Sequence, residues 1–206
     1  MKSSLITVAF FLLGCLSGVK LSFDFDAHNA SVWVLYCLMI LIGISLGSDA
    51  NMKEAITQIR PKMLLVPLAT IGGTILFSAV GGFLLSRWTA FDCMAVGSGF
   101  AYYSVSSILI TQLKTASMGV QIATELGTIA LLSNIFREMF ALLGAPLIRR
   151  YFGYLAPISA AGIGSSDISL AVITKYCGLN AVPIAILHGL LINITMPFFV
   201  SFFCKL

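Results

Sequence analysis

The amino-acid sequence predicts an all-α integral membrane protein with about five transmembrane helices and two broken or re-entrant segments. Of its 206 residues, 59% are hydrophobic and only 10% are charged, and the mean hydropathy is +1.01. Soluble domains carry about 25% charged residues, so this chain is expected to use the bilayer as its solvent. Two segments, 93–112 and 155–174, stand apart because they are rich in Gly and Ser where an apolar helix is expected.

Five apolar runs predict the transmembrane helices. The first two are short, and a loop with two aspartates separates them. The third contains no charged residue and is long enough for a hydrocarbon core of about 30 Å. The fourth is unusually long, about 45 Å as a single helix. The predicted spans are residues 5–21, 32–47, 63–86, 119–148 and 181–204.

The two unusual segments predict broken helices. Residues 97–107, GSGFAYYSVSS, and residues 162–172, GIGSSDISLAV, both begin with Gly-x-Gly and continue with serines. Irregular backbone at membrane depth survives only where protein or a water-filled cavity satisfies it. Paired Gly-interrupted segments therefore indicate a transporter binding site. The alternative is two ordinary helices whose small residues allow close packing.

The basic residues predict the orientation of the chain in the membrane. The basic loop at residues 48–62 should be cytoplasmic, which also places the N-terminus inside. For the arginines at 149–150 to be cytoplasmic as well, segment 93–112 must dip in from outside and return. Segment 155–174 then enters from inside, so the two segments are opposed and the C-terminus lies outside. Lys114 is left outside, which is an objection to this topology.

The stretch NIFREMFALLGAPLIRR, residues 134–150, carries two adjacent charges inside the fourth span. Glu138 lies about 16 Å along a helix from Arg149, which puts it close to the midplane. A charge there costs at least about 2.5 kcal/mol, and adjacent residues on a helix do not face one another. Arg137 and Glu138 each need a partner elsewhere, and Asp167 in the second broken segment is a candidate.

These charges predict a polar cavity at mid-membrane that binds a substrate or protons. One carboxyl held by Arg137 and one free to change protonation would suit a proton-coupled carrier. The alternative is an ion pair of Arg137 with Glu138 or Asp167 that only fixes helix packing. The serines and tyrosines of the breaks and His188 are further candidates, although each also has an ordinary packing role. The candidate substrate- or proton-binding residues are Glu138, Asp167, Arg137, Asn134, Tyr102, Tyr103, Ser104, Ser165, Ser166 and His188.

No metal, cofactor or nucleic-acid site is expected. The five cysteines are scattered without a C-x-x-C pair, which is not typical of a zinc site or a disulfide framework. The net charge of +4 comes from basic residues at the ends of apolar runs, where they set topology. An intramembrane hydrolase is the enzymatic alternative, since Ser104 or Ser165 could pair with His188. The sequence has no nucleophile elbow and no H-E-x-x-H pattern, so we expect no enzyme.

Four stretches together resemble the bacterial lysine exporter family (LysO), over roughly residues 5 to 204. The resemblance implies proton-coupled export of L-lysine by antiport across the bacterial inner (plasma) membrane, with Glu138 and Asp167 as essential acidic residues. Arginine or ornithine as the substrate, and sodium as the coupling ion, remain open. The stretches are GSGFAYYSVSS at 97–107, NIFREMFALLGAPLIRR at 134–150, GIGSSD at 162–167 and VPIAILHG at 182–189.

The chain departs from this family in length. Single-chain members look longer at the N-terminus, so the resemblance implies a split form. Its missing spans would come from a separate small membrane protein, or the chain would work as a homo-oligomer. Residues 1–206 are expected to form a single membrane-embedded transporter domain. The alternatives are a structural or regulatory subunit of a two-component transporter, or a carrier for another small cationic solute or ion.

Overall fold

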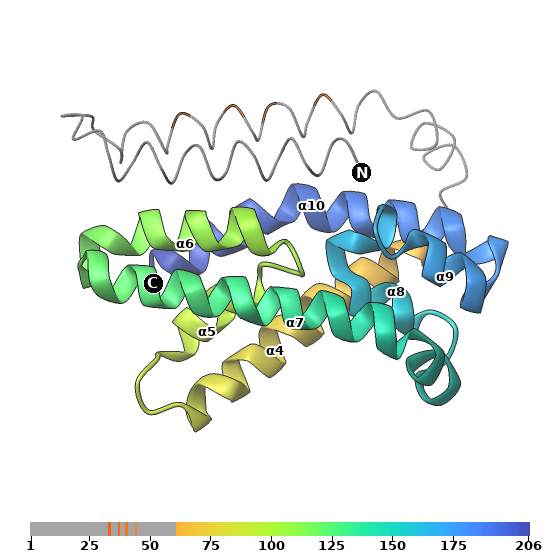
Figure 1. Ribbon diagram of the computed structural model, residues 1–206, viewed down its shortest axis with the longest axis horizontal. Helices are drawn as coiled ribbons and strands as arrows, with labels where there is room; N and C mark the ends of the chain where they lie inside the picture. The colour runs from red at the N-terminus through yellow and green to blue at the C-terminus, as the bar shows by residue number, and fades with distance from the viewer. Residues whose placement is uncertain (1–32, 34–36, 38–39, 41–43, 45–60) are drawn as a thin grey trace, which may run out of the picture. The chain divides into compact units, whose positions relative to one another are not determined.

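The computed structural model describes residues 61–206 and four isolated positions before them, 33, 37, 40 and 44. The chain divides into two compact units, Met1–Gly43 and Ile44–Leu206, and the description below concerns the second (Figure 1). The first two predicted spans and most of the basic loop lie outside the described residues. The expectation of a single transporter domain therefore stays a prediction.

Residues 61–206 contain helices and connecting turns but no strand, which confirms the all-α class. Three stretches are long and apolar enough to cross a membrane, Pro61–Leu84, Val120–Phe152 and Leu179–Cys204. They correspond to the third, fourth and fifth predicted spans. The elements are η1 Pro61–Leu64, α4 Leu65–Leu84, α5 Ala90–Gly97, α6 Tyr103–Met118, α7 Val120–Phe152, α8 Ala156–Ala161, η2 Gly162–Ser166, α9 Leu170–Cys177, η3 Leu179–Ala181 and α10 Val182–Cys204.

The long helix α7 has a glycine at each end. Gly119 (φ 80°) separates it from α6, and Gly153 (φ 93°) ends it. Positive φ is sterically easy only for glycine, so both positions mark the limits of the helix. Arg149 and Arg150 lie in the last turn, where cations complement the helix dipole.

The first unusual segment is broken, as predicted, but it is longer than 93–112. It forms α5 and α6 with a break between them, where Phe100 (φ 46°) and Ala101 (φ 72°) have positive φ. Helix α5 begins three residues earlier than predicted because Thr89 and Asp92 form a capping box, in which each side chain accepts the other residue's backbone N–H. Helix α6 continues until the chain reaches the glycine before α7.

The second unusual segment is also broken. Helix α8 passes into the short 3-10 helix η2 at Gly162 (φ 59°), and the chain turns before α9 begins. Gly162 is required here, because a Cβ at this position would lie 2.2 Å from the Phe100 carbonyl oxygen. The observed segment extends beyond the predicted 155–174, to Cys177.

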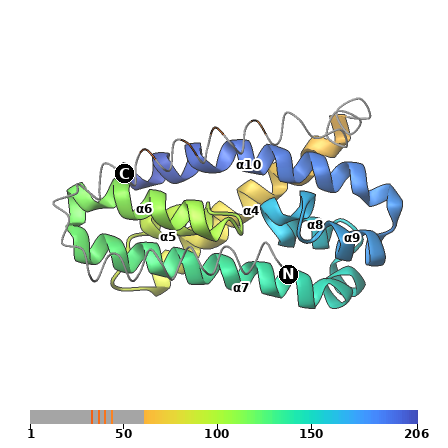
Figure 2. The same cartoon turned by 45° about the horizontal axis from the view of Figure 1, so that its top comes forward.

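The two broken segments are hairpins of opposed orientation, as predicted, and they meet tip to tip. Figures 1 and 2 show α6 beside the first half of α7, and α8 and α9 beside its second half. At the meeting point the Ile163 N–H donates to the Phe100 carbonyl oxygen at 3.0 Å. Helix α10 packs along both hairpins. The breaks in the two hairpins therefore lie together, far from either end of α7.

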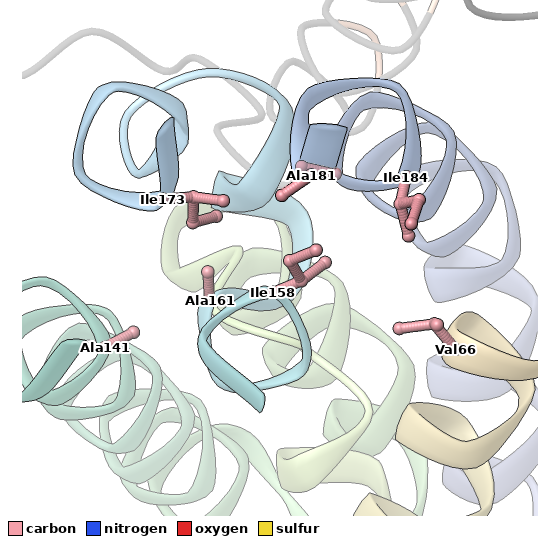
Figure 3. Packing of buried hydrophobic residues seen from close by; sticks show 8 residues of the cluster. Val66, Ala141, Ile158, Ala161, Ile173, Ala181 and Ile184 are labelled. Carbon is pink, nitrogen blue, oxygen red and sulfur yellow. The ribbon is translucent and has the colours of Figure 1, made fainter. Parts of the chain in front are cut away.

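A cluster of small and branched apolar residues fixes the second hairpin in place (Figure 3). Ile158 and Ala161 of α8 are 0% and 1% exposed and lie among residues of the surrounding helices. Small side chains let helix backbones approach closely, which is how helices associate in membranes. The cluster comprises Val66, Ala141, Ile158, Ala161, Ile173, Ala181, Ile184 and Ala185.

A buried ion pair joins the two helices of the first hairpin. Lys114 Nζ of α6 lies 2.8 Å from Asp92 Oδ1 of α5, and the two side chains are 6% and 1% exposed. Lys114 is thus neutralised inside the protein and is no longer an objection to the predicted topology. A second pair, Arg87 with Glu125 at 2.6 Å, is exposed at the same end of the structure. The side of the membrane on which each terminus lies stays a prediction.

Candidate functional site

The structure brings Glu138 and Asp167 together at the second break. Glu138 comes from the middle of α7, and Asp167 comes from the turn that follows η2. Both approach Gly164: a Cβ placed on this glycine would lie 3.8 Å from Glu138 Oε1 and 3.9 Å from Asp167 Oδ1. These two carboxylates lie almost thirty positions apart in the sequence. In the structure they face the same small space.

Neither carboxylate has a cationic partner among the described residues. The side chain of Asp167 accepts a hydrogen bond from the next backbone N–H, that of Ile168. Glu138 is half-buried, and Asp167 is exposed within the described part of the chain. Two nearby like charges repel one another, so this arrangement favours a bound cation or bound protons. Within residues 61–206, no group of three or more His, Cys, Asp or Glu side chains is arranged to hold a metal ion.

Ser169 supplies a third oxygen to this space, and sequence reasoning missed it. Its Oγ lies 3.5 Å from the same Cβ position on Gly164. Ser169 is 2% exposed, and its hydroxyl has no hydrogen-bond partner in the described part of the chain. Residues 162–172 hold three serines, and only the fold shows which of them faces the carboxylates.

Arg137 does not hold either carboxylate, which corrects the prediction of an Arg137–carboxylate pair. Its guanidinium donates to the carbonyl oxygens of Ala160 and Ser159, both at 3.3 Å, and to Thr74 Oγ1 at 3.4 Å. It also lies over the Phe100 ring, with Cζ 5.7 Å from the ring centre. Arg137 thus connects three separate elements at the point where the hairpins meet.

The break in α8 explains why Arg137 binds there. A helix that ends inside a protein leaves its last carbonyl groups without backbone partners. The end also carries a partial negative charge that attracts a cation. The planar guanidinium offers several donors in fixed directions, so it can satisfy two of these carbonyl groups at once.

Asn134 hydrogen-bonds backbone groups at the first break, as Arg137 does near the second. Its Oδ1 accepts from the Ala101 N–H at 2.8 Å, and its Nδ2 donates to the carbonyl oxygens of Val96 at 3.1 Å and Ala130 at 2.9 Å. Asn134 is 3% exposed, and all three partners are backbone groups. Its observed contacts join the break to α7 and do not line an open cavity.

His188 and Ser165 are fully buried, each at 0% exposure, and hold α10 against its neighbours. The two imidazole nitrogens of His188 lie 2.9 Å from Thr70 Oγ1 and 3.0 Å from Ser165 Oγ. Ser165 also donates to the Ala185 carbonyl oxygen at 2.9 Å. A serine and a histidine within hydrogen-bond reach is what the hydrolase alternative requires. Both side chains are fully buried and bonded to neighbouring helices, so the geometry favours a packing role.

The remaining candidates lie around the two breaks. Ser166 donates to the Ile163 carbonyl oxygen at 3.1 Å. Tyr102 and Tyr103 begin α6 and are half-buried, whereas Ser104 is exposed. A substrate- or proton-binding role for these four residues stays a prediction.

Opposed broken hairpins between membrane-spanning helices, with carboxylates at their meeting point, are an arrangement typical of secondary transporters. The chain belongs to the lysine exporter LysO family, whose profile matches residues 8–204.

Two relatives give the extent of the similarity. The chain is 31% identical to "Lysine exporter LysO" of Escherichia coli (strain K12), over 96% of this chain and 62% of that protein. It is 26% identical to a "Putative lysine exporter" of Haemophilus influenzae Rd, over 85% of each chain. The chain thus spans less than two thirds of the length of the Escherichia coli relative. No solved structure matches the chain.

Proposed function

We propose that this protein exports L-lysine across the bacterial inner membrane in exchange for protons. The observation that supports this proposal most directly is the meeting of Glu138 and Asp167 over Gly164, without a cationic partner in the described part of the chain. The names of the two relatives support lysine as the cargo. The opposed hairpins support a carrier that opens to each side in turn.

The two carboxylates suggest how transport and protons are coupled. In a low-dielectric site a cationic side chain is attracted strongly to carboxylates, and the same carboxylates can instead bind protons. Cargo and protons then compete for one site. Protons entering from the more acidic outside would displace lysine there, and their release into the cytoplasm would restore the site for the next lysine.

Arg137 and Asn134 have a supporting role in this proposal. Both bind the broken backbone, as their observed contacts indicate. Neither competes with the cargo for the carboxylates. The expected partner, a small membrane protein or a second copy of the chain, stays a prediction.

Lysine efflux from loaded cells tests the proposal. Glu138→Gln and Asp167→Asn keep the size of each side chain and remove its charge. Each substitution should lower the efflux rate about tenfold or more, equivalent to about 1.4 kcal/mol of lost interaction. Glu125→Gln is the matched control, because Glu125 is an exposed carboxyl on the same helix, paired with Arg87 at the surface.

Efflux at the wild-type rate in both variants, at equal protein level in the membrane, would reject the mechanism. Repeating the assay in vesicles with an imposed pH gradient or an imposed sodium gradient identifies the coupling ion. Export driven by the sodium gradient alone would contradict proton coupling.

A further inference from the structure

We propose that Ser169 and Gly164 complete a subsite for a primary ammonium group, and that the group bound there is the side-chain ammonium of the cargo. This inference rests on the proposed function, and it adds two residues to the pair of carboxylates. It assigns the Ser169 hydroxyl as a group that contacts the ammonium, and Gly164 as the residue that leaves room for the ammonium.

The hydroxyl of Ser169 is the first observation behind this subsite. Buried polar groups in proteins are nearly always hydrogen-bonded, and an unsatisfied one destabilises the fold. Ser169 is 2% exposed and unpaired within the described residues. It stands at the N-terminus of α9, yet its side chain makes no capping hydrogen bond. Its position is therefore not explained by the stability of the helix.

The space over Gly164 is the second observation. A Cβ built on this glycine would lie 3.5 Å from Ser169 Oγ, 3.8 Å from Glu138 Oε1 and 3.9 Å from Asp167 Oδ1. Three oxygens, one from α7 and two from the turn before α9, thus lie around one point. An ammonium group has three N–H donors, which matches the number of oxygens.

Gly164 is not required by the backbone. Its φ lies outside the range that side chains rarely adopt, and the three nearest distances are ordinary van der Waals separations. An alanine would fit without a collision, but its methyl group would occupy the point that the three oxygens surround. Glycine at this position therefore keeps the space open.

The side-chain ammonium of lysine suits this space better than its α-ammonium. The α-ammonium is attached to the same carbon as the α-carboxylate, which Glu138 and Asp167 would repel. Four methylene groups separate the side-chain ammonium from that carboxylate. The charge of the subsite thus orients the cargo with its side chain toward Glu138 and Asp167.

Lysine binding to the purified full chain in lipid nanodiscs tests this subsite, with isothermal titration and thermal unfolding as the two readouts. Ser169→Ala should lower lysine affinity about tenfold or more, while the melting temperature without lysine stays equal or rises, because an unpaired buried hydroxyl is removed. Gly164→Ala should keep its melting temperature and lose lysine binding.

Two matched controls accompany these variants. Gly81→Ala adds the same methyl group at a glycine of α4 with open space around it. Ser117→Ala removes a serine hydroxyl that bonds the Lys114 carbonyl oxygen at the end of α6. Both should bind lysine as the wild type does.

Analogues identify the bound group. Cadaverine, which has the ammonium but no carboxylate, should compete with lysine. Norleucine, which has the amino-acid head and a side chain without the ammonium, should not compete. Competition by norleucine alone would overturn the assignment of the side-chain ammonium.

The outcomes separate this inference from the proposed function. If the wild type does not bind lysine, the proposed function fails. If the wild type binds lysine and Ser169→Ala binds it equally well, the subsite is overturned while the proposed function stands. A sodium-induced stabilisation that Ser169→Ala abolishes, with lysine affinity unchanged, would also overturn it. If Gly164→Ala fails to fold, the lysine affinity of Ser169→Ala decides whether the subsite stands.

Discussion

Arg137 and Asn134 lie one turn apart on α7, and both direct their polar atoms at backbone that the breaks leave without partners. Asn134 binds the first break and Arg137 binds the end of α8, which precedes the second. In a membrane these backbone groups have no water to satisfy them, so their partners must come from the protein. Asn134 and Arg137 thus complete the backbone at the breaks, whereas Glu138 on the same helix faces the space over Gly164.

Arg137→Lys tests this division at the scale of one residue. Lysine keeps the positive charge but loses the planar fork of donors that reaches several acceptors at once. We expect a melting temperature several degrees lower and reduced lysine efflux, measured on the purified protein and in loaded cells. Arg150→Lys, at an exposed position in the last turn of α7, should change neither. If Arg137→Lys were as stable and active as the wild type, the positive charge alone would explain the role of Arg137.

Part of this site could be predicted from the sequence. The position of Glu138 far from the ends of an apolar helix, and of Asp167 beside a Gly-x-Gly pattern, was enough to suggest that they meet. The partner of Arg137 could not be predicted, because it depends on which carbonyl groups the break in α8 exposes. Ser169 could not be predicted either, since its importance comes from the direction of one hydroxyl.

The breaks themselves are visible in sequence, but the ends of the helices around them are not. Glycines and serines predict an interruption, whereas the start of α5 depends on the capping box at Thr89 and the end of α6 on Gly119. The contact between the two tips depends on tertiary packing. A Cβ at Gly162 would collide with the Phe100 carbonyl oxygen, so this glycine permits the hairpins to touch. Any motion that separates the tips must break the hydrogen bond between them.

The buried pair of Asp92 and Lys114 should hold the first hairpin together. Lys114→Met leaves the Asp92 carboxylate buried without its cation, and such changes cost about 3–5 kcal/mol. We therefore expect a clear loss of stability, measured by thermal or denaturant unfolding of the purified protein. The double variant Asp92→Asn, Lys114→Met should recover much of this loss, because no buried charge remains unpaired.

The exposed pair of Arg87 and Glu125 gives the matched control for this element. Its side chains are 64% and 40% exposed, and surface ion pairs contribute about 0–1 kcal/mol. Arg87→Met should therefore cost far less than Lys114→Met. Equal losses of stability in the two single variants would show that burial does not make the Asp92–Lys114 pair more important for stability than the exposed pair.

At the scale of the described chain, the order of elements repeats itself with reversed direction. The spanning helix α4 is followed by one broken hairpin, and the spanning helix α7 is followed by the other. Because each hairpin returns to the end where it began, α7 runs opposite to α4. Repeats of opposite orientation that meet at mid-membrane are typical of secondary transporters. This repetition places both breaks, and the carboxylates at the second break, far from either end of α7.

The opposed hairpins also make a prediction about the whole molecule in the membrane. The turns before α5 and after α6 should lie outside, and the turns after α7 and after α9 should lie inside, if the arginines that end α7 are cytoplasmic. In a version with the native cysteines replaced by serine, a membrane-impermeant thiol reagent applied to intact cells should label Ser86→Cys and Ser117→Cys. It should label Tyr154→Cys and Asn180→Cys only after the cells are opened, although all four positions are exposed in the structure. Labelling of all four in intact cells, or of the second pair alone, would contradict this topology.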